Sequence, residues 1–182
     1  AQSYPSEPEK LYYNENVYRT PHGSNEYREI MQVGLECLGD VDLYTQCEVI
    51  LLACKSLQKL SDESLMVVSH LGFVSGLLES CGLSHSLEEK ILKCIGHKNA
   101  HEIIRLCEAS NVSTSICDSL VALTSLYGSF TETLVRAEEL IKNEKMREAL
   151  EQLRELAGVL STEPECSSMK LDFSVINDLS YY

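Results

Sequence analysis

Hydrophobic and polar residues alternate in two stretches near the start of the chain. Lys10–Tyr18 is rich in aromatic and other residues that favour extended backbone, and Arg28–Leu38 resumes a strand pattern. The segment Thr20–Asn25 between them is dense in residues that form turns. The two stretches therefore predict an antiparallel hairpin that closes through this turn.

The hydrophobic period changes to that of a helix after the second stretch. An apolar stripe that includes Cys47 and Cys54 runs through Leu43–Leu60, and Asp42 at its start suits the positive end of a helix dipole. Leu65–Leu71 is short and β-branched in its middle, which is typical of a strand. The pattern predicts one long helix followed by a further strand.

Helices are expected from residue 72 to about residue 160. Residues that cap helices mark four expected starts: Ser86, Asn99, Ser113 and Ser129. Met169–Asn177 then alternates as a return strand. This order predicts an α+β fold, an antiparallel sheet with a helical insertion, divided into 1–71, 72–160 and 161–182.

Charge and composition narrow the possible functions. Of the 182 residues, 44% are hydrophobic and 28 are acidic against 15 basic, giving a formal net charge of −13. This balance argues against a broad surface for nucleic acid or anionic membranes. No apolar run approaches the roughly 20 residues that span a bilayer. The chain starts without Met, and we expect it to be an internal piece of a larger core.

Eight cysteines leave two readings open, a cytoplasmic protein with free thiols and a secreted protein held by disulfides. The helical spacing of Cys47 and Cys54 among apolar residues favours free thiols that pack in a core. Cys94, His97 and His101 have the spacing of metal ligands, but no fourth ligand is evident. We therefore expect no metal site and no cofactor.

The stretch Arg28–Leu38 presents two different faces, because alternate residues of a strand share a side. Its odd positions are apolar and are expected to pack on a core: Met31, Val33, Leu35 and Cys37. Its even face carries Gln32, Gly34 and Glu36 in its middle. A central glycine lets a ligand approach the backbone between an amide and a carboxylate. Alternation by itself is more typical of a strand whose polar side simply faces water.

The residues around this stretch favour the ligand-binding reading. Val17–Thr20, Arg28-Glu29 and Gln32–Glu36 resemble motif 2 of the class II aminoacyl-tRNA synthetases in its histidyl form. The resemblance implies the antiparallel class II core. It also implies histidine binding by Gln32 and Glu36, with Arg19 and Arg28 as candidate phosphate-binding residues.

The end of the chain carries a second resemblance. Leu171–Tyr182 is similar to the histidine-binding strand of the same family, and this similarity implies that Tyr181 and Tyr182 lie near the ligand. The synthetases have Arg-Gly-Leu-Asp ahead of the tyrosine pair, whereas this chain has Asn177 in place of the arginine. Asparagine cannot stabilise developing negative charge as a cation does, so formation of a histidyl adenylate is not expected.

The helical section resembles the regulatory subunits of the short-form ATP phosphoribosyltransferases, from Ser69–Glu79 to the Leu126–Gly128 turn and Ala149–Leu160. The resemblance implies a non-catalytic cytoplasmic protein of histidine biosynthesis that senses histidine and binds a catalytic subunit. It implies a homo-oligomer at full length. The synthetase motifs 1 and 3 are not found in the chain. A divergent histidyl-tRNA synthetase remains the alternative.

Overall fold

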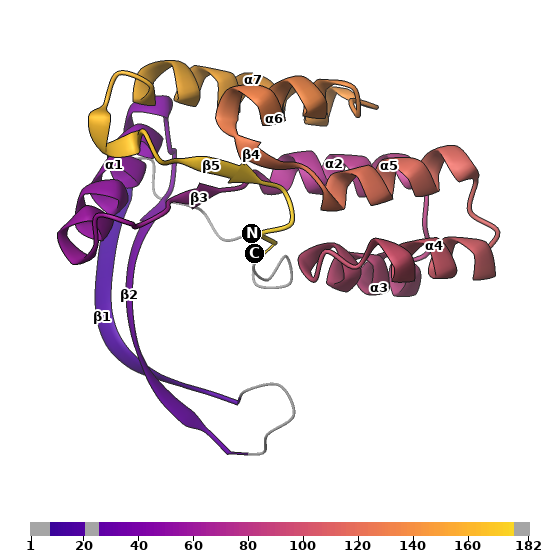
Figure 1. Cartoon of the computed structure of the whole chain (residues 1–182), viewed down its shortest axis with the longest axis horizontal. Coiled ribbons are helices and arrows are strands. Elements are labelled where there is room, and N and C mark those ends of the chain that lie inside the picture. The colour runs from indigo at the N-terminus through magenta and orange to yellow at the C-terminus, as the bar shows by residue number, and fades with distance from the viewer. Residues whose placement is uncertain (1–7, 21–25, 177–182) are drawn as a thin grey trace.

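The computed structural model describes residues 8–20 and 26–176. Its first two strands, β1 (Glu9–Arg19) and β2 (Arg28–Leu38), form an antiparallel hairpin in which Arg19 lies opposite Arg28 and Glu9 opposite Leu38. This confirms the predicted hairpin. Figure 1 shows it as a curved arm that leaves the body of the molecule beside α1 (Leu43–Leu60). An ion pair between Lys10 and Glu48 joins the base of the arm to that helix.

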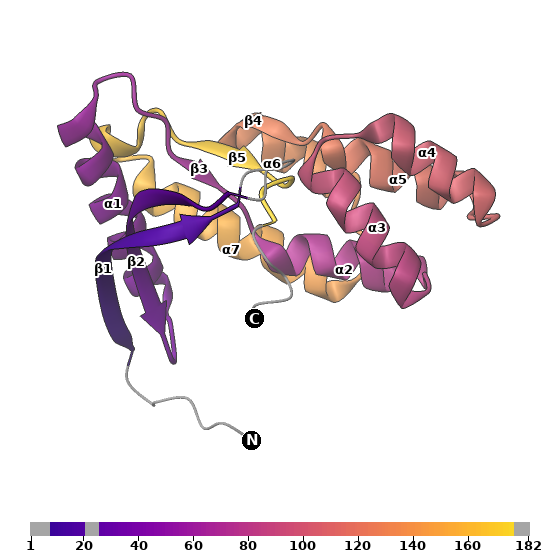
Figure 2. The same cartoon turned by 90° about the horizontal axis from the view of Figure 1, so that it is seen from below.

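The body of the molecule is helical. Its helices after α1 are α2 (Leu71–Cys81), α3 (His85–Gly96), α4 (Ala100–Ala109), α5 (Thr114–Thr124), α6 (Phe130–Glu138), α7 (Glu144–Leu160) and the short 3-10 helix η1 (Pro164–Cys166). Helix α7 packs against α1, α2 and α6, while α3, α4 and α5 form the other end of the body (Figures 1 and 2). Among the described residues, no helix is both long and apolar enough to cross a membrane.

Three short strands form a second sheet in the order β3 (Val67–Val68), β5 (Lys170–Asp172) and β4 (Tyr127–Ser129). Strand β4 is antiparallel to β5, but β3 is parallel to it. The expectation of a purely antiparallel sheet is therefore wrong for this pair. The described part of the chain has a mixed α and β structure with two small sheets.

Two of these strands are shorter than predicted, and local hydrogen bonds explain why. The strand expected over 65–71 stops early because the Nδ1 atom of His70 accepts the Gly72 N–H and begins α2. The strand expected over 169–177 ends at Asp172, whose Oδ1 atom accepts the Ser174 N–H at 2.9 Å. Such a side-chain bond two residues ahead turns the backbone. Strand β4 was not predicted.

Side-chain caps define most helix starts. Asn99 and Ser113 accept backbone N–H groups at the starts of α4 and α5, as predicted. Ser129 begins α6 and bonds the side chain of Glu132. The expected start at Ser86 is wrong by two residues: Ser84 is the residue before α3, and it makes no side-chain capping hydrogen bond.

The hydrophobic core lies in the helical body and includes the thiols of Cys47 and Cys54 from α1. The hairpin contributes nothing to it: every residue of β1 and β2 is exposed or half-buried. We define the Met31 face of the hairpin as Tyr12, Met31, Val33 and Leu35. Met31 and Val33 remain 71% and 70% exposed. The prediction that these odd positions pack on a core is therefore wrong for Met31, Val33 and Leu35, while Cys37 is half-buried against α1.

Candidate ligand-binding face of the hairpin

The opposite side of the hairpin carries the predicted ligand-binding residues. We define the Gln32 face as Tyr13, Arg19, Gln32, Gly34 and Glu36, which the strand register places on one side of the two strands. Arg28 lies directly opposite Arg19, so two guanidinium groups stand at the same end of this face. The register thus places Arg19, Arg28, Gln32 and Glu36 along the same face of the hairpin, while Tyr181 and Tyr182 lie outside the described residues.

A chain of hydrogen bonds organises the middle of the Gln32 face. The Nη2 atom of Arg19 donates to Oε1 of Gln32 at 3.1 Å, and Nε2 of Gln32 donates to the hydroxyl of Tyr13 at 2.9 Å. Arginine has donors only, so its bond identifies the oxygen of the Gln32 amide and fixes the amide orientation. Gln32 is therefore held from both ends before any ligand arrives.

Gly34 has a partner that the sequence pattern did not reveal. The ring of Tyr13, which lies opposite Gly34 in the register, occupies the space beside it: a Cβ added to Gly34 would lie 2.2 Å from Cζ of that ring. The close approach that glycine permits at this position is made by Tyr13. The contact depends on the register that pairs Arg19 with Arg28 and so places Tyr13 against Gly34, and the structure supplies this register.

The charged side chains of the hairpin are divided between its two faces and its base. Glu29 accepts a hydrogen bond from the Asn16 amide at 2.8 Å on the Met31 side of the hairpin. Glu36 projects from the Gln32 face and is exposed. At the base of the arm, the hydrogen bond to Glu48 raises the pKa of Lys10. The Gln32 face carries two cations, Arg19 and Arg28, at one end, Glu36 toward the other end, and Glu15 opposite Gln32 between them.

A cavity of about 270 Å³ lies on the other side of the hairpin base, between α1, α7 and the end of β3. It is lined by Cys37, Val41, Gln46, Val49, Ile50, Val68, Ser69, His70, Gln152, Leu153 and Leu156. His70 is fully engaged there, because Nδ1 accepts from Gly72 and Nε2 lies 2.9 Å from Oε1 of Gln152. Of the predicted ligand-binding residues that the structure describes, none lines this cavity, so it is separate from the Gln32 face.

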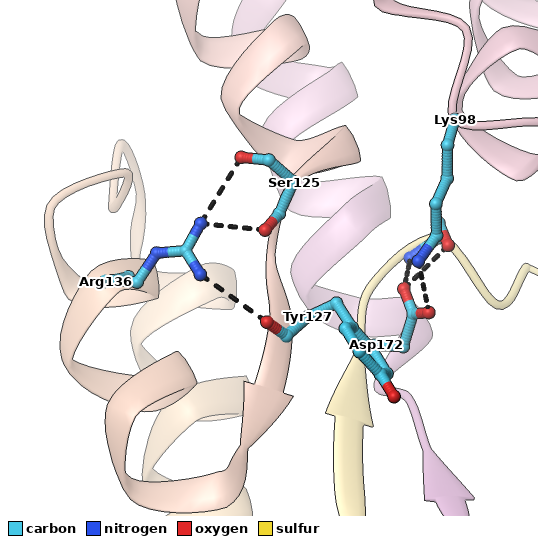
Figure 3. A network of polar contacts seen from close by, with 6 residues as sticks. Lys98, Ser125, Tyr127, Arg136 and Asp172 are labelled. Atoms are coloured by element: carbon cyan, nitrogen blue, oxygen red, sulfur yellow. Dashed lines mark hydrogen bonds and ion pairs between the residues drawn. The ribbon is translucent and has the colours of Figure 1, made fainter.

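A further polar cluster, around the carboxylate of Asp172, lies at the start of the Leu171–Tyr182 stretch that resembles the histidine-binding strand. Lys98, in the turn between α3 and α4, donates to Oδ2 of Asp172 at 2.7 Å and lies 4.6 Å from the centre of the Tyr127 ring (Figure 3). Ser174 donates to Oδ1 of the same carboxylate through its N–H and its hydroxyl. Burial raises the pKa of Asp172, but the bonds from Lys98 and Ser174 outweigh it and hold the pKa below its usual value.

Most cysteines of the chain are packing residues of the core, and none of the eight, all within the described residues, forms a disulfide. All eight cysteines are free, and six of them are buried. Burial and the neighbouring thiol of Cys117 raise the pKa of Cys107 to about 12, which makes it an unreactive core residue.

Cys94 lies on α3, and His97 and His101 follow it along the chain. No group of three or more His, Cys, Asp or Glu side chains within 8–20 and 26–176 is arranged to hold a metal ion.

The fold is of the class II synthetase type, as a family model and a solved structure show. The chain belongs to the histidyl-tRNA synthetase family, whose model matches residues 2–182. The predicted resemblance to the regulatory subunits of ATP phosphoribosyltransferase is also confirmed. The regulatory subunit from Geobacter metallireducens is 27% identical over 177 residues, covering 96% of this chain and 41% of that protein. A histidine–tRNA ligase from Methanococcus aeolicus is 29% identical over 180 residues, covering 96% and 42%.

Solved structures agree with this assignment. A protein from Bacillus halodurans, described as an ATP phosphoribosyltransferase regulatory subunit/histidyl-tRNA synthetase, superposes with a TM-score of 0.82 at 28% identity, covering 97% of this chain and 46% of that one. A HisG:HisZ complex of ATP phosphoribosyl transferase from Thermotoga maritima contains a chain with the same fold, at a TM-score of 0.65 and 23% identity, covering 94% and 59%. This chain spans about half the length of the proteins it matches.

Proposed function

We propose that this chain is a core segment of a non-catalytic regulatory subunit of ATP phosphoribosyltransferase that senses histidine. The observation that carries the proposal is the Gln32 face: the histidyl form of motif 2 is kept, with Gln32 oriented by Arg19 and Glu36 exposed beside it. The similarity to regulatory subunits over 96% of the chain supports the same assignment. The asparagine at position 177, where the synthetases have arginine, supports a binding role without adenylate chemistry.

The regulatory mechanism that follows is a difference in affinity. Histidine inhibits only if it binds two states of the assembly unequally, since a ligand with equal affinity for both shifts nothing. In this proposal Gln32 and Glu36 contact the amino acid, Tyr181 and Tyr182 complete the pocket, and Arg19 and Arg28 are the candidate phosphate-binding residues. The partner is a catalytic ATP phosphoribosyltransferase subunit, as in the Thermotoga complex. We also propose a homo-oligomer in the cytoplasm for the full-length protein.

The domain division belongs to the same proposal. Residues 1–71 and 161–182 are assigned to the class II core, and 72–160 to the helical insertion. Limited proteolysis that cuts near residues 71 and 160 before any other position supports the division.

Calorimetric titration with L-histidine tests the ligand site. The native protein should release or absorb heat on binding, and Glu36→Ala should abolish that heat. Glu29→Ala is the matched control, because Glu29 lies on the opposite side of the same strand, and its titration should match the native one. Absence of heat with native protein, or unchanged heat with Glu36→Ala, overturns the histidine site.

A divergent histidyl-tRNA synthetase is the second candidate, favoured by the similarity to the Methanococcus ligase. The two candidates differ in the chemistry they perform. Histidine-dependent exchange of pyrophosphate into ATP establishes the synthetase. Histidine-sensitive stimulation of a catalytic ATP phosphoribosyltransferase subunit, without exchange, establishes the regulatory subunit.

A further inference from the structure

The ring of Tyr13 changes what a ligand on the Gln32 face meets. Added to Gly34, a Cβ would lie 2.2 Å from Cζ, 2.3 Å from the hydroxyl oxygen and 2.6 Å from Cε1 of that ring. The ring therefore fills the space next to the backbone that a bare glycine would leave open. A ligand above Gly34 rests on the Tyr13 ring and not on the peptide.

The geometry of the strand requires such a ligand to cross this ring. Gln32 and Glu36 are the polar residues on either side of Gly34 on the same face, and four strand residues span about 13 Å. A ligand that bonds both side chains passes over the position of Gly34.

Tyr13 also controls the amide that the ligand would meet. Its hydroxyl accepts one N–H of Gln32 at 2.9 Å, while Arg19 bonds the amide oxygen at 3.1 Å. One N–H and one lone pair of the amide remain for a ligand. The hydroxyl thus decides in which direction Gln32 offers its remaining donor.

We propose that Tyr13 is the specificity-determining residue of the Gln32 face, an aromatic platform for a flat ligand ring and a positioning residue for the Gln32 amide. The inference rests on the proposed function, and it adds the reason why an imidazole side chain is selected. Aromatic rings gain from offset stacking beyond the area they bury, and a non-aromatic amino acid gains nothing from it. Tyr12, the next residue along β1, points to the Met31 face and is 83% exposed, so it provides a matched control.

Two substitutions separate the platform from the hydroxyl. Tyr13→Leu removes the aromatic ring and should weaken L-histidine binding by about tenfold, from the loss of stacking and of the Gln32 bond. Tyr13→Phe keeps the ring and removes the hydroxyl, so it should weaken binding by only about threefold. Tyr12→Leu should leave the affinity unchanged. No residue of β1 is buried, so all three variants should fold, which far-ultraviolet circular dichroism checks.

The measurement is calorimetry with L-histidine and, in parallel, with L-glutamine as a non-aromatic amino acid. The ratio of the two affinities should fall in Tyr13→Leu and hold in Tyr12→Leu, a change that a purely structural role of Tyr13 would not produce. If native protein binds histidine and Glu36→Ala abolishes binding, but Tyr13→Leu binds like native protein, the inference is wrong and the proposed function stands. If native protein does not bind histidine, the histidine site fails and this inference fails with it.

Discussion

The hairpin arm and the helical body use apolar residues in opposite ways. In the body, apolar residues at helical spacing meet those of other helices, and Phe73, Leu150 and Phe173 are completely buried. In the arm, apolar residues at strand spacing share one face just as regularly, yet Met31 and Val33 remain mostly in water. The difference shows that a regular pattern determines which residues share a face, and that only a second surface determines whether the face is buried.

Among substitutions that leave the protein folded, truncating a core aromatic residue should cause the largest effect. Phe73 of α2 stacks on Phe173, with ring centres 4.6 Å apart, and both are fully buried. Phe73→Ala should lower the free energy of unfolding by about 3–5 kcal/mol. Tyr12→Ala on the arm should change it by less than about 0.5 kcal/mol. Urea unfolding of the two variants measures this free energy. Equal losses of stability in both would contradict the contrast between body and arm.

The ion pair of the body should matter more than the ion pair at the base of the arm. Asp172 is buried and bonded by Lys98 and Ser174, so Asp172→Asn should cost about 1–2 kcal/mol at pH 7. Glu48→Gln, which breaks the exposed pair with Lys10, should have little effect.

The same pair makes a prediction about pH. The folded-state pKa of Asp172 is lowered, so its contribution is present above the unfolded pKa of about 3.9 and is lost as the pH falls through the folded value. The stability difference between native protein and Asp172→Asn should therefore be constant from about pH 7 to 5 and shrink below about pH 4. Urea unfolding at a series of pH values checks this, and a difference that persists undiminished at pH 2 would refute it.

Substituting two asparagines, one in the body and one in the arm, should give stability losses that differ by an intermediate amount. Asn143 caps α7 by accepting the Met146 N–H, and its Nδ2 atom donates to the Gly76 carbonyl of α2 at 2.7 Å. Asn143→Ala should cost about 1 kcal/mol. Asn16 on the arm bonds only the exposed Glu29 side chain, and Asn16→Ala should be nearly neutral. Thermal unfolding of both variants tests the ranking, which fails if Asn16→Ala is the more destabilising.

The smallest effect is expected on the Met31 face itself. Val33→Lys places a charge where the native side chain is 70% exposed, so the free energy of unfolding should change by less than about 0.5 kcal/mol. The same substitution at Leu150, which is fully buried, should prevent folding because an unpaired charge enters the core. A large loss from Val33→Lys would mean that this face packs against another part of the molecule.

The sequence predicted long elements well because their periodicity extends over several turns. The bounds of α1 and β2 agree with the expectation to the residue. Short strands were predicted less well. Strand β4 has three residues, too few for a period to show, and the ends of β3 and β5 depend on side-chain bonds by His70 and Asp172.

The candidate site was predicted in part. The polar face with Gln32, Gly34 and Glu36 follows from alternation, and the structure adds the bonds by which Arg19 and Tyr13 hold Gln32. The role of Tyr13 requires the strand register, which a single strand pattern does not contain. The contact of Lys98 with Asp172 joins residues 74 positions apart, and no local pattern reports it.

The parallel pair of β3 and β5 has a consequence for how the molecule folds. Val67 lies opposite Lys170 and Val68 opposite Leu171, so this contact closes a loop of about 100 residues. Neighbouring helices can associate early because they are close in sequence, whereas this strand pair must wait until the chain between has become compact. Closing the three-stranded sheet should therefore be the late event of folding, and a refolding experiment should detect it as a slow phase after most helical signal has returned.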